Sequence, residues 1–332
     1  MNKFAIAAIA ALTVASSGVA TAEPVTLKVA LGSPEPTIWS DQWRRYEQKV
    51  EEMSGGDIQL DLFYAGQLGS MGDTLKSTLS GRVDMWSGSV PILSSVSPEF
   101  NTLTFPFLFD SDEQVTCVVP KMLEKAQEVA GKKYHFLAFQ PIEHQAMAGS
   151  EPITAPEMLK GKKVRSAPSQ SSINFFQAVG ATPLPLPAEE TPSAASTGLV
   201  EAVNFGLAYA MASGLMQSLP VYTRADLQFN LGATIVSPRT WAKLDEDQKR
   251  IMTEALSVIG FEQSTREILD FETAMMDKLK EMGGEVIFLD DSQKKAWTDA
   301  ARATWDQSLG ELRGDAGAFF EAVKSAKDSC PS

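Results

Sequence analysis

The sequence has few of the residues that most often hold metals or act as nucleophiles. Its 332 residues include two cysteines, Cys117 and Cys330, and two histidines, His135 and His144. These four lie too far apart in the chain to form a recognisable zinc or redox motif. The motifs G-x-S-x-G, Walker A and H-E-x-x-H are absent as well. We therefore expect no metal site, no cofactor and no enzymatic activity. The spacing leaves open whether the two cysteines form a disulfide that pins the C-terminus.

Basic residues and long hydrophobic runs are also scarce. The chain has 29 Lys and Arg against 42 Asp and Glu, a net charge of -13. This balance argues against binding to nucleic acid or to anionic membranes, so any anion site must be local. No stretch beyond the N-terminus approaches the ~20 apolar residues of a membrane-spanning helix. These absences favour an acidic, globular protein that binds neither nucleic acid nor anionic membranes.

The N-terminus has the pattern of a cleavable secretory signal. Residues 1–22 carry a cation at Lys3, an apolar core of small residues, and Ala20, Thr21 and Ala22 in the A-x-A pattern of a cleavage site. The mature chain is then expected to start near Glu23 and to be periplasmic in a Gram-negative cell. Losing Lys3 leaves 28 basic against 42 acidic residues, a net charge of -14.

The rest of the chain alternates strand-like and helix-like segments, which predicts an α/β fold with two lobes. Each lobe is expected to be a mostly parallel sheet flanked by helices. Two extended segments with a break between them, 134–140 and 143–149, connect the lobes, and 245–284 reads as an almost uninterrupted helix that spans both. The expected parts are a signal peptide (1–22), lobe I (23–144 plus about 226–245), lobe II (145–225), and the spanning and C-terminal helices (246–332).

Arg165 is the most informative candidate residue. It ends a short strand, and a helix follows it from Ser169 onward. Ligands in open α/β sheets bind outside the carboxyl ends of strands, where helix N-termini also favour anions. The planar fork of arginine suits a carboxylate. The spacing favours a carboxylate site, but a surface arginine on an edge strand fits it equally well.

Asn204 and Phe205 end a strand that could lie parallel to the Arg165 strand, which would bring them to the same rim. A strand-end turn is the alternative for Asn204. Two other features have ordinary explanations. Glu189 and Glu190 could be an acid-base pair but fit the opening of a helix better. Residues 110–114 begin like a calcium loop but fit a helix N-cap with an acidic first turn better.

Five ordered segments resemble one known family. They read YAGQLGSMGDTLKSTLSGRVDMW (64–86), TLTFPFLF (102–109), LKGKKVRSAPSQ (159–170), VGATPLPLPAEE (179–190) and ASTGLVEAVNF (195–205). The chain thus resembles the DctP-type solute receptors of tripartite ATP-independent periplasmic (TRAP) transporters, over essentially its whole mature length. That resemblance implies two lobes that close over an organic acid, a long helix spanning both lobes, and delivery to an ion-driven membrane permease.

The resemblance also implies roles for particular residues. Arg165 matches the arginine that clamps the ligand carboxylate. Trp86 and Ser87 follow the family's G-x-x-D-M pattern at a strand end of lobe I, and Asn204 and Phe205 fall in another ligand-binding segment.

The chain departs from the family pattern at two places. Gln145 occupies the position where many members have a second arginine, and residues 190–195 lack the usual E-V-Y-x-A-L pattern. Without the second cation, a monocarboxylate is favoured, with a polar group facing Gln145 and an apolar part near Trp86 or Phe205.

The sequence therefore predicts a monomeric periplasmic receptor for a small organic acid, working with TRAP permease subunits. A binding module that feeds a sensor would have the same fold and arginine, and adjacent genes for membrane subunits would distinguish it. An exported hydrolase or lyase would need a nucleophile or an acid-base pair, for which the sequence offers no clear candidate.

Overall fold

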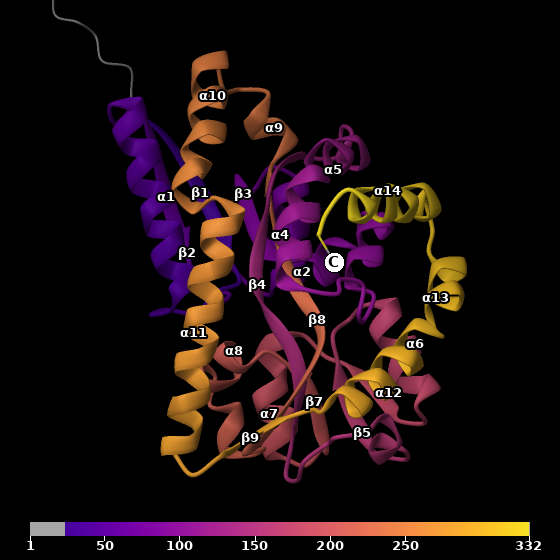
Figure 1. Ribbon diagram of the computed structural model, residues 1–332. Coiled ribbons are helices and arrows are strands. Elements are labelled where there is room, and N and C mark those ends of the chain that lie inside the picture. The colour runs from indigo at the N-terminus through magenta and orange to yellow at the C-terminus, as the bar shows by residue number, and fades with distance from the viewer. Residues whose placement is uncertain (1–23, 332) are drawn as a thin grey trace, which may run out of the picture.

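A single mixed β-sheet runs through the computed structural model, which describes residues 24–331 (Figure 1). The predicted signal peptide, residues 1–22, lies outside the described residues. Eight strands follow the order β2-β1-β3-β8-β4-β7-β5-β6, and a ninth, β9, pairs with β8. The strands are β1 (Val25–Leu31), β2 (Ile58–Phe63), β3 (Met85–Ser89), β4 (His135–Gly149), β5 (Lys163–Ser166), β6 (Thr182–Pro185), β7 (Ala202–Phe205), β8 (Val221–Val236) and β9 (Glu285–Phe288).

Two long antiparallel strands, β4 and β8, join the two lobes. In lobe I, β1 pairs in parallel with β2 and β3; in lobe II, β5 pairs in parallel with β6 and β7. The central strands β4 and β8 pair with each other and cross from one group to the other (Figure 1). The prediction of two α/β lobes is confirmed, but their sheets are continuous rather than separate.

The predicted break between 140 and 143 is wrong. Strand β4 continues through it, and the pairing with β8 only shifts register between Pro141 and Glu143. Proline has no N–H to donate to the ladder, so a bulge at this point keeps the strand intact.

The first helix of lobe I is bounded by local signals in the sequence. α1 begins at a capping box in which Thr37 and Ser40 bond each other's backbone N–H, and it ends at Gly55 in the left-handed conformation (φ 61°). Its apolar side is buried. The lobe I helices are α1 (Ile38–Ser54), α2 (Met71–Leu79), α3 (Val90–Leu93), the 3₁₀ helix η1 (Pro98–Thr104), α4 (Asp112–Lys121) and α5 (Leu123–Ala130).

The lobe II helices are short. Residues 154–161 form only one 3₁₀ turn, because Pro156 opens it and Gly161, two residues after its end, adopts a positive φ of 78°. The helices are η2 (Pro156–Leu159), α6 (Gln170–Ala178), η3 (Ala188–Glu190), α7 (Thr191–Ser196), α8 (Leu207–Ala212) and η4 (Leu215–Gln217).

The C-terminal part holds the two lobes together. The predicted helix over 245–284 is interrupted, because Gly260 leaves the helical conformation (ψ 142°). The long helix α11 then runs beside β4 from α1 in lobe I to α8 and β9 in lobe II (Figure 1). The elements are α9 (Pro238–Trp241), α10 (Glu246–Glu254), η5 (Ala255–Ile259), α11 (Phe261–Glu281), α12 (Asp291–Arg302), α13 (Trp305–Glu311) and α14 (Ala316–Asp328).

The two cysteines are joined. Cys117 on α4 and Cys330, just after α14, form a disulfide with their Cα atoms 5.8 Å apart and 213 positions apart in sequence. None of the helices within residues 24–331 combines the length and the apolar character needed to cross a membrane.

Candidate functional site

A cleft lies between the two lobes at the carboxyl ends of four strands. Gly32 follows β1, Ser87 lies in β3, Arg165 lies near the end of β5, and Phe205 ends β7, and all four line the cleft. This is the edge at which ligands bind in open α/β sheets. The cavity has a volume of about 150 Å³, whereas one ordered water needs roughly 10–15 Å³, so it can take an organic molecule.

Arg165 is a buried cation in the wall of this cleft. Its side chain is 4 % exposed, and β5 lies between β6 and β7, so the surface-arginine alternative is wrong. The guanidinium donates from Nε and Nη2 to the Leu186 carbonyl at 3.0 and 2.8 Å, and from Nη1 to the Asn204 carbonyl at 2.7 Å. It also lies over the Phe205 ring, 4.6 Å from the centroid.

The charge of Arg165 is not neutralised within residues 24–331, where all of its hydrogen-bond acceptors are carbonyl groups. Burial lowers the pKa of Arg165 to about 9. A buried charge without a partner costs several kcal/mol. Because three of its five N–H donors are used, two remain for an anion in the cleft.

Asn204 and Phe205 have different positions. The predicted parallel pairing of their strand with the Arg165 strand is confirmed, with Arg165 opposite Val203. Phe205 lines the cleft. Asn204 is not among the residues lining the cleft. Its side-chain amide donates to the Ala146 carbonyl at 3.2 Å, and its backbone carbonyl accepts a hydrogen bond from Arg165.

Of Trp86 and Ser87, likewise, only one lines the cleft. Ser87 lines the cleft and donates from Oγ to the Gln140 Oε1 at 2.6 Å. Trp86 is fully buried in the lobe I core, where its indole N–H donates to the Met71 carbonyl at 3.0 Å. Successive strand residues point to opposite faces, so the Trp86 side chain enters the core while the Ser87 side chain faces the cleft.

Gln145 lines the cleft from β4 and is 6 % exposed. Its side chain makes no hydrogen bond to any residue of the described range 24–331, and its polar atoms are not sealed inside the protein. The amide is therefore available to a molecule in the cleft.

Sequence reasoning missed several aromatic and polar residues of the cleft. Trp39 and Trp43 lie at helical spacing on the buried face of α1, and this face also borders the cleft. The Trp39 indole N–H donates to the Ile142 carbonyl at 3.1 Å. Helical spacing marks such a face without saying whether protein or ligand covers it. The other missed lining residues include Tyr209, Gln140, Glu143 and Asn230.

Glu143 is a buried carboxyl in the cleft wall. It is 2 % exposed, and its Oε2 accepts from the backbone N–H of Ala208 at 2.8 Å. Burial, together with the nearby Glu272 carboxylate, raises the pKa of Glu143 well above its ordinary value. Glu189 and Glu190, predicted to open a helix, lie in the 3₁₀ turn η3 directly before α7. Glu189 lines the cleft, whereas Glu190 is not among its lining residues.

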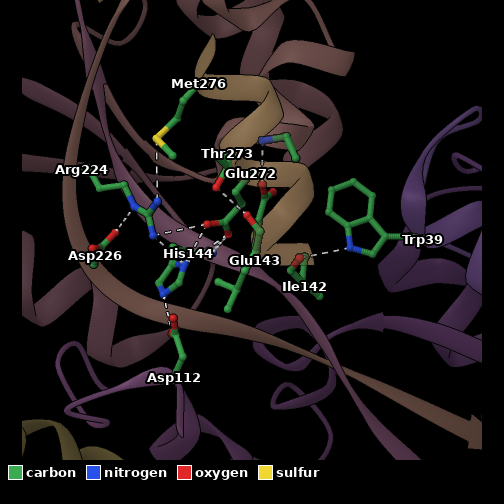
Figure 2. Close-up of polar contacts among 12 residues, drawn as sticks. Trp39, Asp112, Ile142, Glu143, His144, Arg224, Asp226, Glu272, Thr273 and Met276 are labelled. Carbon is green, nitrogen blue, oxygen red and sulfur yellow. Dashed lines mark hydrogen bonds and ion pairs between the residues drawn. The ribbon is translucent and has the colours of Figure 1, made fainter. Parts of the chain in front are cut away.

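A charged cluster lies at the crossing of the lobes (Figure 2). The His144 ring on β4 bonds through Nδ1 to Glu272 Oε2 on α11 and through Nε2 to Asp112 Oδ1 on α4, both at 2.9 Å. Arg224 on β8 reaches Glu272 at 3.5 Å and Asp226 at 2.7 Å. Burial opposes ionisation of His144, but the bonds to Asp112 and Glu272 outweigh it and raise the pKa of His144 to about 10.

This hinge cluster, made of Asp112, His144, Arg224, Asp226 and Glu272, also explains residues 110–114. Ser111 caps α4, and Asp112 lies in its first turn, as the helix-cap interpretation predicts. No group of three or more His, Cys, Asp or Glu side chains in the described part of the chain could hold a metal ion.

A model of the family described as bacterial extracellular solute-binding protein, family 7 (DctP), matches residues 31–311. The chain belongs to this family. Its fold and its predicted resemblance to TRAP solute receptors are thereby confirmed, and the family consists of binding proteins rather than enzymes.

Relatives of this family 7 protein bind different solutes. The ectoine-binding periplasmic protein TeaA of Halomonas elongata is 22% identical over 300 residues, which cover 84% of this chain and 87% of TeaA. The sialic acid-binding periplasmic protein SiaP of Vibrio cholerae is 22% identical over 323 residues, covering 94% and 96%. A TRAP periplasmic solute-binding protein from Sulfitobacter sp. NAS-14.1, solved with bound β-D-galacturonate, has the same fold (TM-score 0.83, 20% identity, covering 90% of this chain and 99% of that one).

Proposed function

We propose that this family 7 protein is the periplasmic receptor of a TRAP transporter and that its solute is a small monocarboxylate. It acts as a monomer and passes the solute to the membrane permease subunits. The observation that carries the proposal is the buried, un-neutralised Arg165 in the wall of the cleft.

Arg165 binds the carboxylate in this proposal. The carbonyls of Leu186 and Asn204 fix three of its N–H donors, and the Phe205 ring supports the guanidinium plane. The remaining two donors can form charge-assisted bonds to one carboxylate. An uncharged analogue would leave the cation unpaired, so it should bind far more weakly.

Neighbouring groups have distinct tasks. Gln145 and Phe205 contact the solute directly, and Ser87 contacts it from lobe I together with Gln140. Asn204 positions Arg165 through its carbonyl, and Trp86 supports the cleft from the core. Gln145 supplies no charge, so nothing at this position favours a second carboxylate.

Binding is coupled to a hinge on β4 and β8. We assign lobe I to residues 23–144 plus about 226–245 and lobe II to 145–225, so both strands cross between lobes near the hinge cluster. A solute that touches both lobes prefers the closed form and raises its population by the ratio of its two affinities.

A thermal-shift and calorimetric screen of organic acids on wild type and Arg165→Ala tests the proposal. Acid at ~100 times its dissociation constant should stabilise the wild type by about 2.7 kcal/mol. The substitution should abolish this gain. Arg302→Ala is the matched control, because Arg302 is a half-exposed arginine paired with Asp110 outside the cleft. If acids bind Arg165→Ala as tightly as the wild type, or if neutral sugars are the hits, the proposed function is wrong.

A further inference from the structure

We propose that three buried residues form a latch between the lobes: Ser171 on α6 of lobe II, and Asn101 and Thr104 on η1 of lobe I. None of them is among the residues that line the cleft, so they act as positioning residues and do not touch the solute. The latch stabilises the closed form and thereby raises the solute affinity. This inference rests on the proposed function, because it assumes that solute binding is coupled to lobe closure.

The latch consists of hydrogen bonds that cross from one lobe to the other. The hydroxyl oxygens of Thr104 and Ser171 lie 2.7 Å apart, and Ser171 Oγ also donates to the Thr104 carbonyl at 3.1 Å. The side-chain oxygen of Asn101 accepts from the backbone N–H of Ser171 at 3.3 Å. All three residues are at most 5 % exposed. Buried polar groups need hydrogen-bond partners, and here each lobe supplies partners to the other.

One of these bonds contributes to the N-terminal cap of α6. Ser169 caps the helix by accepting from the backbone N–H of Ser172 at 3.4 Å, and Asn101 accepts from the neighbouring N–H of Ser171. The first N–H groups of a helix have no partners within the helix itself. The helix that follows Arg165 therefore receives part of its cap from lobe I, and these two N–H groups are already satisfied by the protein.

The latch also connects to the cleft walls of both lobes. Asn101 Nδ2 donates to Ser94 Oγ at 3.3 Å, and Ser94 Oγ donates to the Pro91 carbonyl at 2.7 Å. Pro91 lines the cleft from lobe I. Ala167 and Pro168, which directly precede the α6 cap, line it from lobe II. A change in the distance between the two walls is thus transmitted to the latch.

The described structure has the two lobes together. Trp43 of lobe I and Arg165 of lobe II are both 4 % exposed, although they line the same cavity of about 150 Å³. A rotation that moves these walls apart would also move α6 away from η1, because the two elements belong to different lobes. The latch bonds are therefore made in the closed form, and the apparent affinity of a solute rises with the population of that form.

The substitution Ser171→Ala tests the latch by calorimetry on the full-length mature protein. The probes are L-lactate and D-glucuronate, a small and a larger monocarboxylate, together with every other acid that the screen of wild type and Arg165→Ala returns. The substitution removes the hydroxyl that bonds to Thr104 and should weaken acid binding about 5- to 30-fold.

The matched control is Ser97→Ala. Ser97 is fully buried, and its Oγ lies 2.7 Å from the Tyr134 hydroxyl, with both residues in lobe I. This substitution should lower the melting temperature, because it also removes a buried hydroxyl bond. It should change the acid affinity by less than twofold, since no bond between the lobes is lost.

The kinetics distinguish a latch from a general loss of stability. The latch is made after the acid has entered the cleft, so Ser171→Ala should raise the release rate by most of the loss in affinity and leave the association rate within twofold of wild type. Trp39 and Trp43 line the cleft and allow both rates to be followed by stopped-flow fluorescence.

Variants of Thr104 test the same bond from lobe I. Thr104→Val removes the hydroxyl at similar volume and should weaken acid binding as Ser171→Ala does. Thr104→Ser keeps the hydroxyl and should stay within threefold of wild type. The double variant Thr104→Val with Ser171→Ala should lose less affinity than the product of the two single losses, because both substitutions remove the same bond.

The outcomes separate the two proposals. If Ser171→Ala and Thr104→Val bind the acids as tightly as the wild type, or if Ser97→Ala weakens binding equally, the latch inference is wrong. The proposed function then stands as long as Arg165→Ala abolishes binding. A loss of affinity in Ser171→Ala that comes from slower association also overturns the latch. If no carboxylate binds the wild type, both proposals fail.

Discussion

Removing the His144 imidazolium should destabilise the protein in a way that depends on pH. The pKa of His144 is raised from 6.5 to about 10 in the folded protein by its bonds to Asp112 and Glu272. A group whose pKa is raised on folding stabilises the folded protein fully below its unfolded-state pKa, which is 6.5 here. This stabilisation is lost as the pH rises through the folded-state pKa of about 10. The difference between these two pKa values contributes about 4 kcal/mol to the free energy of unfolding at pH 7 and about 1 kcal/mol at pH 9.

The substitution His144→Leu keeps a similar volume and removes both bonds of the ring. The free energy of unfolding should fall by about 4 kcal/mol at pH 7, within the range for breaking a buried ion pair. The loss should shrink to about 1 kcal/mol at pH 9. Urea unfolding at pH 7, 8 and 9 measures both values. Taking the difference from wild type cancels groups shared by both proteins, including Arg165, whose pKa is lowered to about 9 by burial.

The other histidine provides the control. His135 stacks on Trp241 with ring centroids 3.6 Å apart, and burial lowers its pKa to about 4, so it is neutral from pH 7 to 9. His135→Leu should therefore lose the same stability at each pH. A loss in His144→Leu that is constant between pH 7 and 9 would refute the assignment of a buried imidazolium to the hinge cluster.

Two further substitutions test other parts of the structure. Cys330→Ser opens the disulfide to Cys117, which closes a loop across 213 positions, and should lower the free energy of unfolding by about 2–4 kcal/mol relative to wild type; an equal melting temperature for the two proteins would contradict this. Trp86→Phe removes the bond to the Met71 carbonyl and should cost about 1–3 kcal/mol of stability while leaving solute affinity within threefold. A large loss of affinity with unchanged stability would show instead that Trp86 contributes to solute binding.

Much of the fold could be predicted because its signals are local. The alternation in β1 and β2, the capped apolar face of α1 and the Ser111 cap of α4 depend only on neighbouring residues. The continuity of β4 through Pro141 could not be predicted, because it depends on pairing with β8, which lies about 90 positions further along the chain.

The location of the candidate site was predicted from the sequence. The differences concern which side chains of a strand face the cleft. Arg165 and Phe205 fall at strand ends that meet in the cleft. Asn204 and Trp86 are each one residue from a lining residue and turn away from the cleft. A strand sequence gives the period of two but not which set faces a ligand. The Arg165→Ala and Trp86→Phe variants test the two facing assignments directly.

The continuity of the sheet determines how this protein can be divided. A cut between residues 144 and 145 would fall inside β4, and a cut near residue 226 would fall inside β8, so each would leave unpaired strand edges on both products. Lobe II also takes β9 from a segment beyond both crossings. Neither lobe is therefore a contiguous, separately expressible fragment. A split reporter made from this receptor should have its break point in an exposed connection between helices rather than at the hinge.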